Sequence, residues 1–241
     1  MRDALKKTGR PIFYSLCNWG SDNTPVWAPA VGNSWRTTGD INPTWYQVQA
    51  NFFKNQKDRF ASGIGGWNDP DMLEVGVGDM LSLEEQKTHF ALWAIVKAPL
   101  LLGLDLNTAS DDVLAIIKNT DLIGINQDPD VVQAYCALGC DNEKGVQMYT
   151  TKKAGTEEAY AVITNFGDAA AKNYTFKVSD TDILPASGTT VSIYDMFEHK
   201  EVFRGADAHA LLNYTITELP SHASAAYRIR VESTELTFLQ A

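Results

Sequence analysis

The chain has 241 residues, 44% of them hydrophobic, and a formal net charge of −10. This length and composition suit one long domain or two ordinary domains with their own cores. The negative charge, without a run of Lys or Arg longer than a pair, argues against nucleic acid and anionic membranes as partners and favours a neutral substrate. The longest apolar stretch, around residues 90–104, is interrupted by Lys97 and Pro99 and is too short for a membrane span.

The first ten residues lack the apolar core of a signal peptide and predict the last turns of a helix that ends at Gly9. From Pro11 to about Asp128, short apolar runs alternate with helical patterns, which is typical of a parallel sheet wrapped by helices. The near-continuous apolar run of residues 11–17 predicts a first strand covered on both faces, followed by the polar loop of residues 18–23.

Further elements follow in the same alternating order. A second strand is expected near residues 33–36, then a helix through residues 45–60, and a third strand within residues 65–72. Ser82 and Glu85 form a capping box that predicts a helix to about residue 97. A fourth strand is expected at residues 99–103, a helix capped by Ser110 at residues 111–118, and a closing segment at residues 122–128.

The pattern changes after Pro129. Runs rich in Val, Ile, Tyr and Thr recur with turn residues between them, which predicts an antiparallel β-sandwich. Alternation around Tyr160 and around Tyr227 predicts one buried and one exposed face for each strand. We therefore expect an α/β domain at residues 1–129 and an all-β domain at residues 130–241. Four strand–helix units are half of an eightfold barrel, and an open half barrel leaves two long edges.

Polar side chains follow each predicted strand. In a barrel, catalytic groups lie at the carboxyl ends of the strands, and the residues at these places are Asn18, Trp19, Arg36, Asp40, Asp69, Asp71 and Asp105. Aromatic rings, an Arg and carboxylates that face one cavity suit a sugar, and cleavage of a glycosidic bond needs a carboxylic acid as proton donor. The alternative is structural: the Trp residues as core, Arg36 as a partner of Asp40, and Asp69 as the cap of a turn before Pro70.

Other chemistry finds little support in the sequence. The four His residues, including His209, lack metal-ligand spacing, and there is no nucleophile elbow or phosphate-binding loop, so neither a metal nor a cofactor is expected. Cys136 and Cys140 are close enough to close a small loop, whereas Cys17 lies in an apolar strand. Sequons at Asn173 and Asn213 fit a secreted glycoprotein.

Several ordered motifs together resemble the second half of an alpha-galactosidase (melibiase) of glycoside hydrolase family 27. The motifs are YSLCNWG at 14–20, GNSWRTTGDI at 32–41, GGWNDPDML at 65–73, LWAIVKAPL at 92–100 and INQD at 125–128. The resemblance implies the second half of a (β/α)8 TIM barrel followed by a β-sandwich, secretion, and retaining hydrolysis of terminal alpha-linked galactose in oligosaccharides or polysaccharides.

The resemblance also implies roles for single residues. Asp40 matches the catalytic acid/base, and Arg36 and Asp71 match residues that hold sugar hydroxyls. Cys17, Asn18 and Trp19 match the loop that reads the substituent on carbon 2, where the bulky Trp19 favours a plain hydroxyl. Asn18 stands where many relatives carry Glu, which affects only the fine specificity.

One element of the family is missing from this chain. The nucleophile belongs to a Lys-Tyr-Asp-Asn-Cys-like motif at the end of the fourth barrel strand, and the only Tyr-Asp pair here, Tyr194–Asp195, lies in the β-domain. We expect Met1 to be an internal start and the chain alone not to turn over substrate. Two alternatives remain: a non-catalytic carbohydrate-binding or assembly fragment, and a related exo-glycosidase for beta-L-arabinopyranosides or alpha-N-acetylgalactosaminides.

Overall fold

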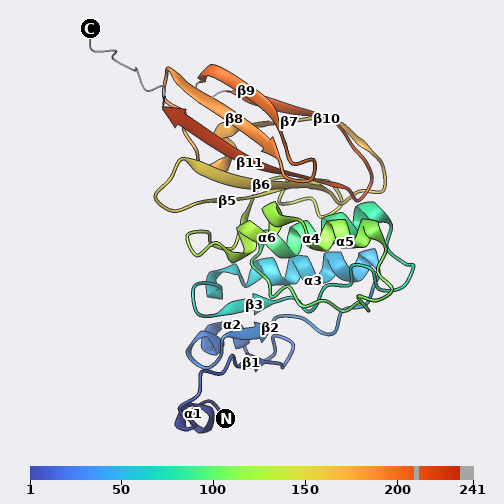
Figure 1. Cartoon of the computed structure of the whole chain (residues 1–241), viewed down its shortest axis with the longest axis vertical. Helices are drawn as coiled ribbons and strands as arrows, with labels where there is room; N and C mark the ends of the chain where they lie inside the picture. The colour runs from blue at the N-terminus through green and yellow to red at the C-terminus, as the bar shows by residue number, and fades with distance from the viewer. Residues whose placement is uncertain (209–211, 234–241) are drawn as a thin grey trace. The chain divides into compact units, whose positions relative to one another are not determined.

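The computed structural model describes residues 1–208 and 212–233 and divides into two compact units, Met1–Tyr135 and Cys136–Ala241 (Figure 1). The division lies a few residues beyond the change in sequence pattern at Pro129. His209 lies outside the described residues. Within the described ranges, no helix is long and apolar enough to cross a membrane.

The first unit is built on a small parallel sheet. Its strands are β1 (Ser15–Leu16), β2 (Ser34–Arg36) and β3 (Trp67–Asp69), in the order β1-β2-β3. Trp35 pairs with Leu16 on one side and Asn68 on the other. Since β2 is the central strand, Trp35 is fully buried, and all three strands run in the same direction with their carboxyl ends at one edge.

Two strand predictions need correction. The first strand is confined to β1, and Ile12 and Phe13 are 41% and 64% exposed, so the expected cover on both faces is wrong. The reason is that β1 is an edge strand of this sheet. The fourth strand, expected at residues 99–103, is reduced to a single parallel bridge between Leu73 and Leu102. Asp71, with φ at 86°, interrupts the extended backbone between β3 and Leu73. A ladder of more than this one bridge therefore does not form.

The helices predicted near residues 1–9, 45–60, 82–97 and 111–118 are confirmed, whereas the helical segments at residues 24–30 and 120–127 were not predicted. Side chains of Thr44, Ser82, Ser110 and Asn119 each accept a backbone N–H and so cap a helix start. The elements are α1 (Arg2–Lys7), α2 (Thr24–Trp27), η1 (Ala28–Ala30), α3 (Trp45–Lys57), η2 (Arg59–Ala61), α4 (Leu83–Ile95), α5 (Asp111–Ile117) and α6 (Thr120–Gln127).

Helix α4 lies at the centre of the unit's packing. It contacts α3, α5 and α6, and every residue from Thr88 to Ile95 is buried. This buried part of the helix cannot display a polar face to water, so its polar side chains must find partners inside the protein. Two of these side chains, His89 and Trp93, form hydrogen bonds with the loop after β3.

The second unit consists of two antiparallel sheets. The larger has the strand order β4-β5-β6-β11-β8-β9, the smaller pairs β10 with β7, and the segment η3 (Val178–Thr181) follows β7. The shared core contains Met148, Ile163, Phe176, Ile193 and Ile229. The strands are β4 (Tyr135–Leu138), β5 (Val146–Lys152), β6 (Glu158–Asn165), β7 (Ala171–Lys177), β8 (Thr189–Asp195), β9 (Lys200–Ala208), β10 (Asn213–Leu219) and β11 (Ser224–Ser233).

The alternation predicted for β11 is confirmed, whereas that for β6 is wrong. In β11, Tyr227 and Ile229 are buried and Arg230 is exposed. In β6 every residue is buried, including Tyr160 and Ala161 on opposite faces. The physical reason is that β6 carries apolar side chains on both faces and is paired on both sides, by β5 and β11.

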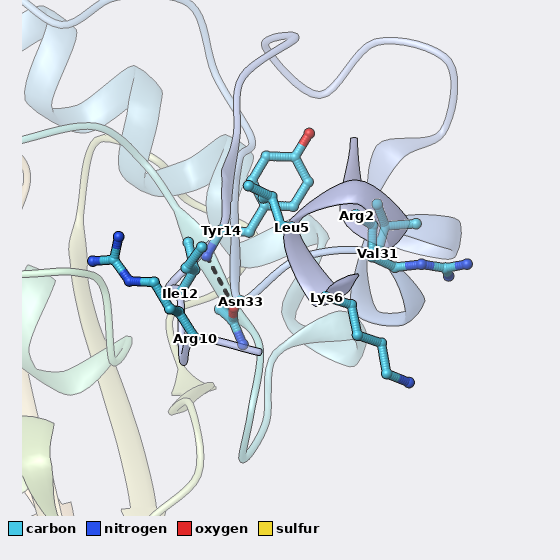
Figure 2. A pocket seen from close by; sticks show the side chains of 8 residues that line it. All are labelled: Arg2, Leu5, Lys6, Arg10, Ile12, Tyr14, Val31 and Asn33. Carbon is cyan, nitrogen blue, oxygen red and sulfur yellow. Dashed lines mark hydrogen bonds between the residues drawn. The ribbon is translucent and has the colours of Figure 1, made fainter. Parts of the chain in front are cut away.

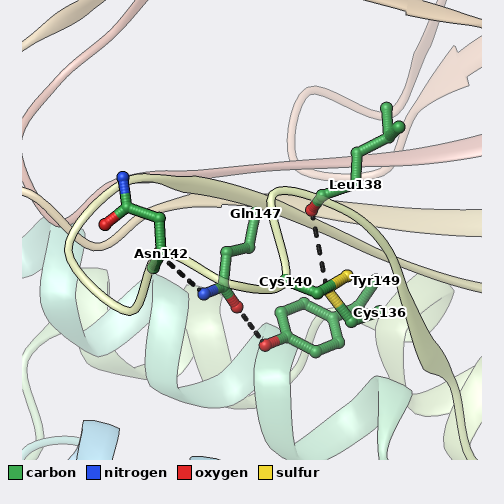
Figure 3. Close-up of a disulfide and its surroundings, with 6 residues drawn as sticks. All are labelled: Cys136, Leu138, Cys140, Asn142, Gln147 and Tyr149. Carbon is green, nitrogen blue, oxygen red and sulfur yellow. Dashed lines mark hydrogen bonds between the residues drawn. A yellow bond between two sulfur atoms is a disulfide. The ribbon is translucent and has the colours of Figure 1, made fainter.

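A disulfide joins Cys136 and Cys140 at the beginning of the second unit, with 5.7 Å between the Cα atoms (Figure 3). The loop that it closes contains Gly139, which has φ at 73° and whose Cβ, if present, would lie 2.2 Å from the Val146 carbonyl oxygen. Only glycine fits this approach. Both sequon residues, Asn173 and Asn213, are exposed on the smaller sheet.

Candidate active site

The carboxyl ends of β1, β2 and β3 bring three loops to one edge of the sheet. These loops cover residues 17–23, 37–41 and 70–72. Gly20 shows how closely the first two approach, because a Cβ on it would lie 2.5 Å from the Thr37 carbonyl oxygen. With φ at 74°, this position also favours glycine by conformation. The edge therefore collects the polar residues that the sequence places after each strand.

Arg36, the last residue of β2, links the two carboxylates of this edge. Its Nη2 lies 3.2 Å from Asp40 Oδ1 and 2.7 Å from Asp71 Oδ2, and it donates to the Gly39 carbonyl oxygen at 2.8 Å. The side chains of Arg36 and Asp71 are only 12% and 15% exposed, whereas that of Asp40 is 76% exposed. The guanidinium thus ties a sheltered carboxylate to one that faces solvent.

Asp71 has a strained backbone, and its carboxylate accepts from Arg36 and from two backbone N–H groups. Its φ of 86° lies in the left-handed region that non-glycine residues avoid, at a cost on the order of 1–3 kcal/mol. Besides Arg36, Asp71 Oδ2 accepts the Ile41 N–H at 2.8 Å, and Oδ1 accepts the Met72 N–H at 2.9 Å. The Asp71 side chain therefore fastens the loop after β2 to the loop after β3.

Asp69 lies behind this pair and shapes the turn. It is only 8% exposed, and its Oδ1 accepts the Asp71 N–H at 2.9 Å across Pro70, which is an Asx turn. Burial raises the pKa of the Asp69 carboxyl, against the lowering effects of the Asp71 N–H and of Arg36. For Asp69 the structure thus shows the turn-capping role.

The first loop presents aromatic surface at this edge. Trp19 is 54% exposed with φ at 62°, and Lys54 of α3 donates to its carbonyl oxygen at 3.1 Å. The Asn18 amide donates to the Ser21 carbonyl oxygen, and its Oδ1 accepts the Thr24 hydroxyl at 2.7 Å, so this side chain shapes its own loop. Cys17 is an exposed free thiol.

Other aromatic and acidic candidates have structural contacts. Trp35 is fully buried and its Nε1–H donates to Asn68 Oδ1 at 2.6 Å, as expected of a core residue. Trp67 at the start of β3 lies under Lys97 Nζ, 5.3 Å from the ring centroid. Asp105 is exposed and accepts hydrogen bonds from the backbone and side chain of Asn107, so it forms a local turn.

Sequence reasoning missed Asn51 of α3, which supports the loop after β3. Its Nδ2–H donates to the Pro70 carbonyl oxygen at 2.9 Å, and Gln47 donates to its Oδ1 at 2.8 Å. Asn51 is only 2% exposed. A polar side chain on the buried side of an amphipathic helix is the signal that identifies such a residue, because burying an amide requires partners.

The two described cavities lie away from this edge. One, of about 220 Å³, lies beside α1 and Asn33, and the charged ends of Arg2, Lys6 and Arg10 point away from it (Figure 2). The other, of about 370 Å³, is lined by Trp67 and Lys97. Trp67 begins β3 and Asp69 ends it, so this cavity is at the opposite end of the strand from Asp71. Neither is lined by Arg36 or Asp40.

Comparison with known proteins gives the site its context. The family model described as "Alpha galactosidase A" (Melibiase_2) matches residues 1–128, which include all three loops. The chain belongs to the alpha-galactosidase A family. "Alpha-galactosidase 3" of Arabidopsis thaliana is 40% identical to it over 225 residues, which are 90% of this chain and 50% of that protein. "Alpha-galactosidase" of Cyamopsis tetragonoloba is 37% identical over 231 residues, 90% of this chain and 53% of that protein.

A solved member of this alpha-galactosidase group has the same fold. The structure of alpha-galactosidase I from Mortierella vinacea matches with a TM-score of 0.81 and 28% identity, over 95% of this chain and 61% of that one. The matched region covers 50% and 53% of the two plant relatives, so this chain spans about half their length. The family is one of glycosidases.

Proposed function

We propose that this family member supplies the acid/base half of a retaining alpha-galactosidase. In this proposal residues 1–129 form the last four β/α units of a TIM barrel and residues 130–241 a β-sandwich. Three parallel strands whose carboxyl ends gather Arg36, Asp40 and Asp71, together with relatives named alpha-galactosidase, support it. The observation that carries it is the exposed Asp40 carboxylate held by a sheltered guanidinium.

Asp40 has the environment that an acid/base catalyst needs. It is exposed to an incoming substrate, and its contact with Arg36 runs through Oδ1, which orients the carboxyl group. We assign the transferred proton to Oδ2. In the first step this proton goes to the glycosidic oxygen of the leaving group, and in the second step Asp40 takes a proton from the attacking water.

The second carboxylate of a retaining pair does not come from Asp71 or Asp69 in this proposal. A nucleophile must approach the anomeric carbon, about 5–5.5 Å from the acid/base carboxyl group. Asp71 accepts from Arg36 and two backbone N–H groups, and Asp69 is buried in its turn. A carboxylate that accepts charge-assisted hydrogen bonds is a weaker nucleophile. We therefore assign the nucleophile to residues outside this chain. We expect the 241 residues alone not to turn over substrate.

The remaining contacts suit a galactosyl group. Arg36 and Asp71 offer donors and acceptors for sugar hydroxyls, and the exposed Trp19 ring offers an apolar face. In the proposal the loop with Cys17, Asn18 and Trp19 faces carbon 2, where the bulk of Trp19 favours a hydroxyl over an N-acetyl group. The substrates are therefore terminal alpha-galactosides of oligosaccharides or polysaccharides.

The test is an Asp40→Asn substitution in the polypeptide purified from the source of this sequence. We expect kcat for melibiose to fall roughly a hundredfold to ten-thousandfold, because the amide cannot donate the proton. Asp105→Asn is the matched control, since Asp105 is an exposed carboxylate in a local turn, and it should retain activity. Unchanged melibiose hydrolysis in Asp40→Asn would refute the proposal.

We also propose export to an oxidising compartment. The Cys136–Cys140 disulfide and the exposure of both sequon asparagines support this location, because disulfides persist mainly outside the reducing cytosol. Fractionation of source cells followed by mass analysis of the Cys136–Cys140 peptide tests it. A reduced peptide in a cytosolic fraction would contradict it.

A further inference from the structure

Three polar side chains of helix α4 point to the loop after β3, which here means the whole segment of residues 70–81 between β3 and α4. Gln86, His89 and Trp93 lie at helix positions i, i+3 and i+7, so they share one face. We call this set the α4 stripe. Each of the three forms a hydrogen bond with the loop's backbone, and none of them contacts Arg36 or Asp40 through a described hydrogen bond or ion pair.

The contacts of the α4 stripe follow the loop in order. Trp93 Nε1–H donates to the Asp71 carbonyl oxygen at 2.7 Å. His89 Nε2 accepts the Glu74 N–H at 2.9 Å, and Gln86 Oε1 accepts the Gly76 N–H at 2.9 Å. The helix therefore holds this loop at Asp71, Glu74 and Gly76.

Burial and mutual contacts restrict the side chains of the α4 stripe. Trp93 and His89 are fully buried, and their rings meet edge to face with 4.1 Å between the centroids. The other end of the Gln86 amide donates to the Leu81 carbonyl oxygen at 3.0 Å. Side chains fixed in this way hold their hydrogen-bonding atoms in defined places.

The loop's opposite side is held by the chain that follows α4. Leu73 N–H donates to the Leu101 carbonyl oxygen at 2.8 Å, and Gly103 N–H donates to the Leu73 carbonyl oxygen at 3.0 Å. The backbone between Asp71 and Gly76 is thus bonded on both sides. This matters because Asp71 has a strained φ, which persists only where the surroundings impose it.

We propose that the α4 stripe positions Asp71, keeping its backbone left-handed so that its carboxylate stays on Arg36 and the Ile41 N–H and is ready for a sugar hydroxyl. Gln86, His89 and Trp93 are positioning residues, because they act through Asp71. This inference rests on the proposed function and deepens it. In the proposed function Asp71 binds a sugar hydroxyl that takes no part in bond cleavage, so loss of its position should weaken binding without slowing the chemical step.

The first test is Trp93→Phe in the source polypeptide, with kcat and KM measured on melibiose. Phenylalanine keeps an aromatic ring but removes the N–H that binds the Asp71 carbonyl oxygen. We expect KM to rise about tenfold, which corresponds to the loss of one buried hydrogen bond, and kcat to stay within about twofold. The control is Leu92→Ala, which removes a fully buried side chain of the same helix that carries no hydrogen-bonding group. It should lower the melting temperature and leave KM unchanged.

A second pair of variants tests rescue. His89→Gln keeps an acceptor for the Glu74 N–H, whereas His89→Leu removes it, so KM should stay near the parent value in the first and rise in the second. Hydrogen exchange of the Glu74 amide gives a readout that does not depend on activity: it should be fast in His89→Leu and slow in the parent and in His89→Gln.

The outcomes separate the two proposals. Unchanged KM in both Trp93→Phe and His89→Leu, while Asp40→Asn abolishes hydrolysis, overturns the positioning role and leaves the proposed function intact. A fall in kcat with unchanged KM in Trp93→Phe also overturns it. Full hydrolysis by Asp40→Asn instead removes the function on which the inference rests, even where the Glu74 amide exchanges as expected.

Discussion

Arg36 is the cation that pairs with both carboxylates of the site. Its side chain is sheltered, whereas its two partners differ in exposure. One nitrogen, Nη2, contacts both Asp40 and Asp71. An ion pair as sheltered as Arg36–Asp71 is costly to break, since removal of one partner leaves a desolvated charge. The Asp40 contact, with 76% of that side chain exposed, contributes little to stability and serves mainly to orient the carboxylate.

His89 gives a prediction for stability against pH. Complete burial lowers the pKa of the His89 imidazole from 6.5 to about 3. The unfolded chain therefore binds a proton at this residue between pH 6.5 and pH 3 and the folded chain does not. The contribution of His89 is fully present above pH 6.5 and declines by up to about 1.4 kcal/mol per pH unit as the pH falls toward 3.

The measurement is the free energy of unfolding from urea titrations between about pH 3.5 and 7, for the parent and for His89→Gln. The parent curve should fall more steeply with decreasing pH than that of the variant. The comparison is needed because neighbouring Glu74, whose pKa is raised by burial and then by Asp71, has the opposite slope. Parallel curves would show that His89 does not titrate differently in the two states.

At the scale of residues, the sequence predicted the Arg36 and Asp40 pairing as one of two alternatives, and the structure shows that pair. It predicted the turn-capping role of Asp69 in the same way. It did not predict the link from Asp71 to Ile41 or the support by Asn51, because these contacts join residues 30 and 19 positions apart and depend on tertiary packing. The catalytic and binding roles of Asp40, Arg36, Asp71 and the 17–19 loop remain predictions.

Among the elements, α4 matters most because it carries the α4 stripe. Its start is fixed by a capping box in which Ser82 Oγ accepts the Glu85 N–H and Glu85 Oε2 accepts the Ser82 N–H. Ser82→Ala should lower the free energy of unfolding by about 1 kcal/mol, the usual value of an N-cap hydroxyl. The measurement is chemical denaturation, with Ser82→Thr as the control that keeps the cap. Equal stability of the Ser82→Ala and Ser82→Thr variants would contradict this assignment.

The elements with local signals were predicted correctly from sequence. Capping side chains and apolar periodicity placed α3, α4 and α5 well, because those signals lie within the helix itself. The strand expected at residues 99–103 did not form, because a strand needs a paired neighbour. Among the described residues this segment has a single bridge, between Leu73 and Leu102. In β6 the error came from a pattern that is apolar on both faces.

At the scale of the whole molecule, the chain combines a mixed unit with an antiparallel one, each with its own buried residues. The change of pattern near Pro129 predicted two domains because strand and helix periodicities differ. The sequence alone left open whether Cys136 and Cys140 are bonded, and the structure shows the disulfide. The half-barrel architecture stays a proposal, because the described residues of the first unit form three parallel strands and a single further bridge.

The disulfide yields a prediction for the second unit. A bridge between residues four positions apart closes a very small loop, so chain entropy allows it to stabilise the unit by about 2 kcal/mol. Replacing both Cys136 and Cys140 with Ser should lower the melting temperature of the second unit. Cys17→Ser is the control, because Cys17 is an exposed free thiol of the first unit. An equal effect of both changes in calorimetry would contradict this.

We propose Asp40 as the acid/base catalyst, with a nucleophile that is neither Asp69 nor Asp71. The most direct measurement is the configuration of the product that the Asp40→Asn source polypeptide forms from an activated aryl alpha-galactoside in the presence of azide. If Asp40 is the acid/base, azide attacks the glycosyl-enzyme intermediate from the side where the parent protein carries the Asp40 carboxylate. Alpha-galactosyl azide then accumulates, and the rate of the variant recovers. Formation of beta-galactosyl azide would identify Asp40 as the nucleophile and refute its assignment as the acid/base catalyst.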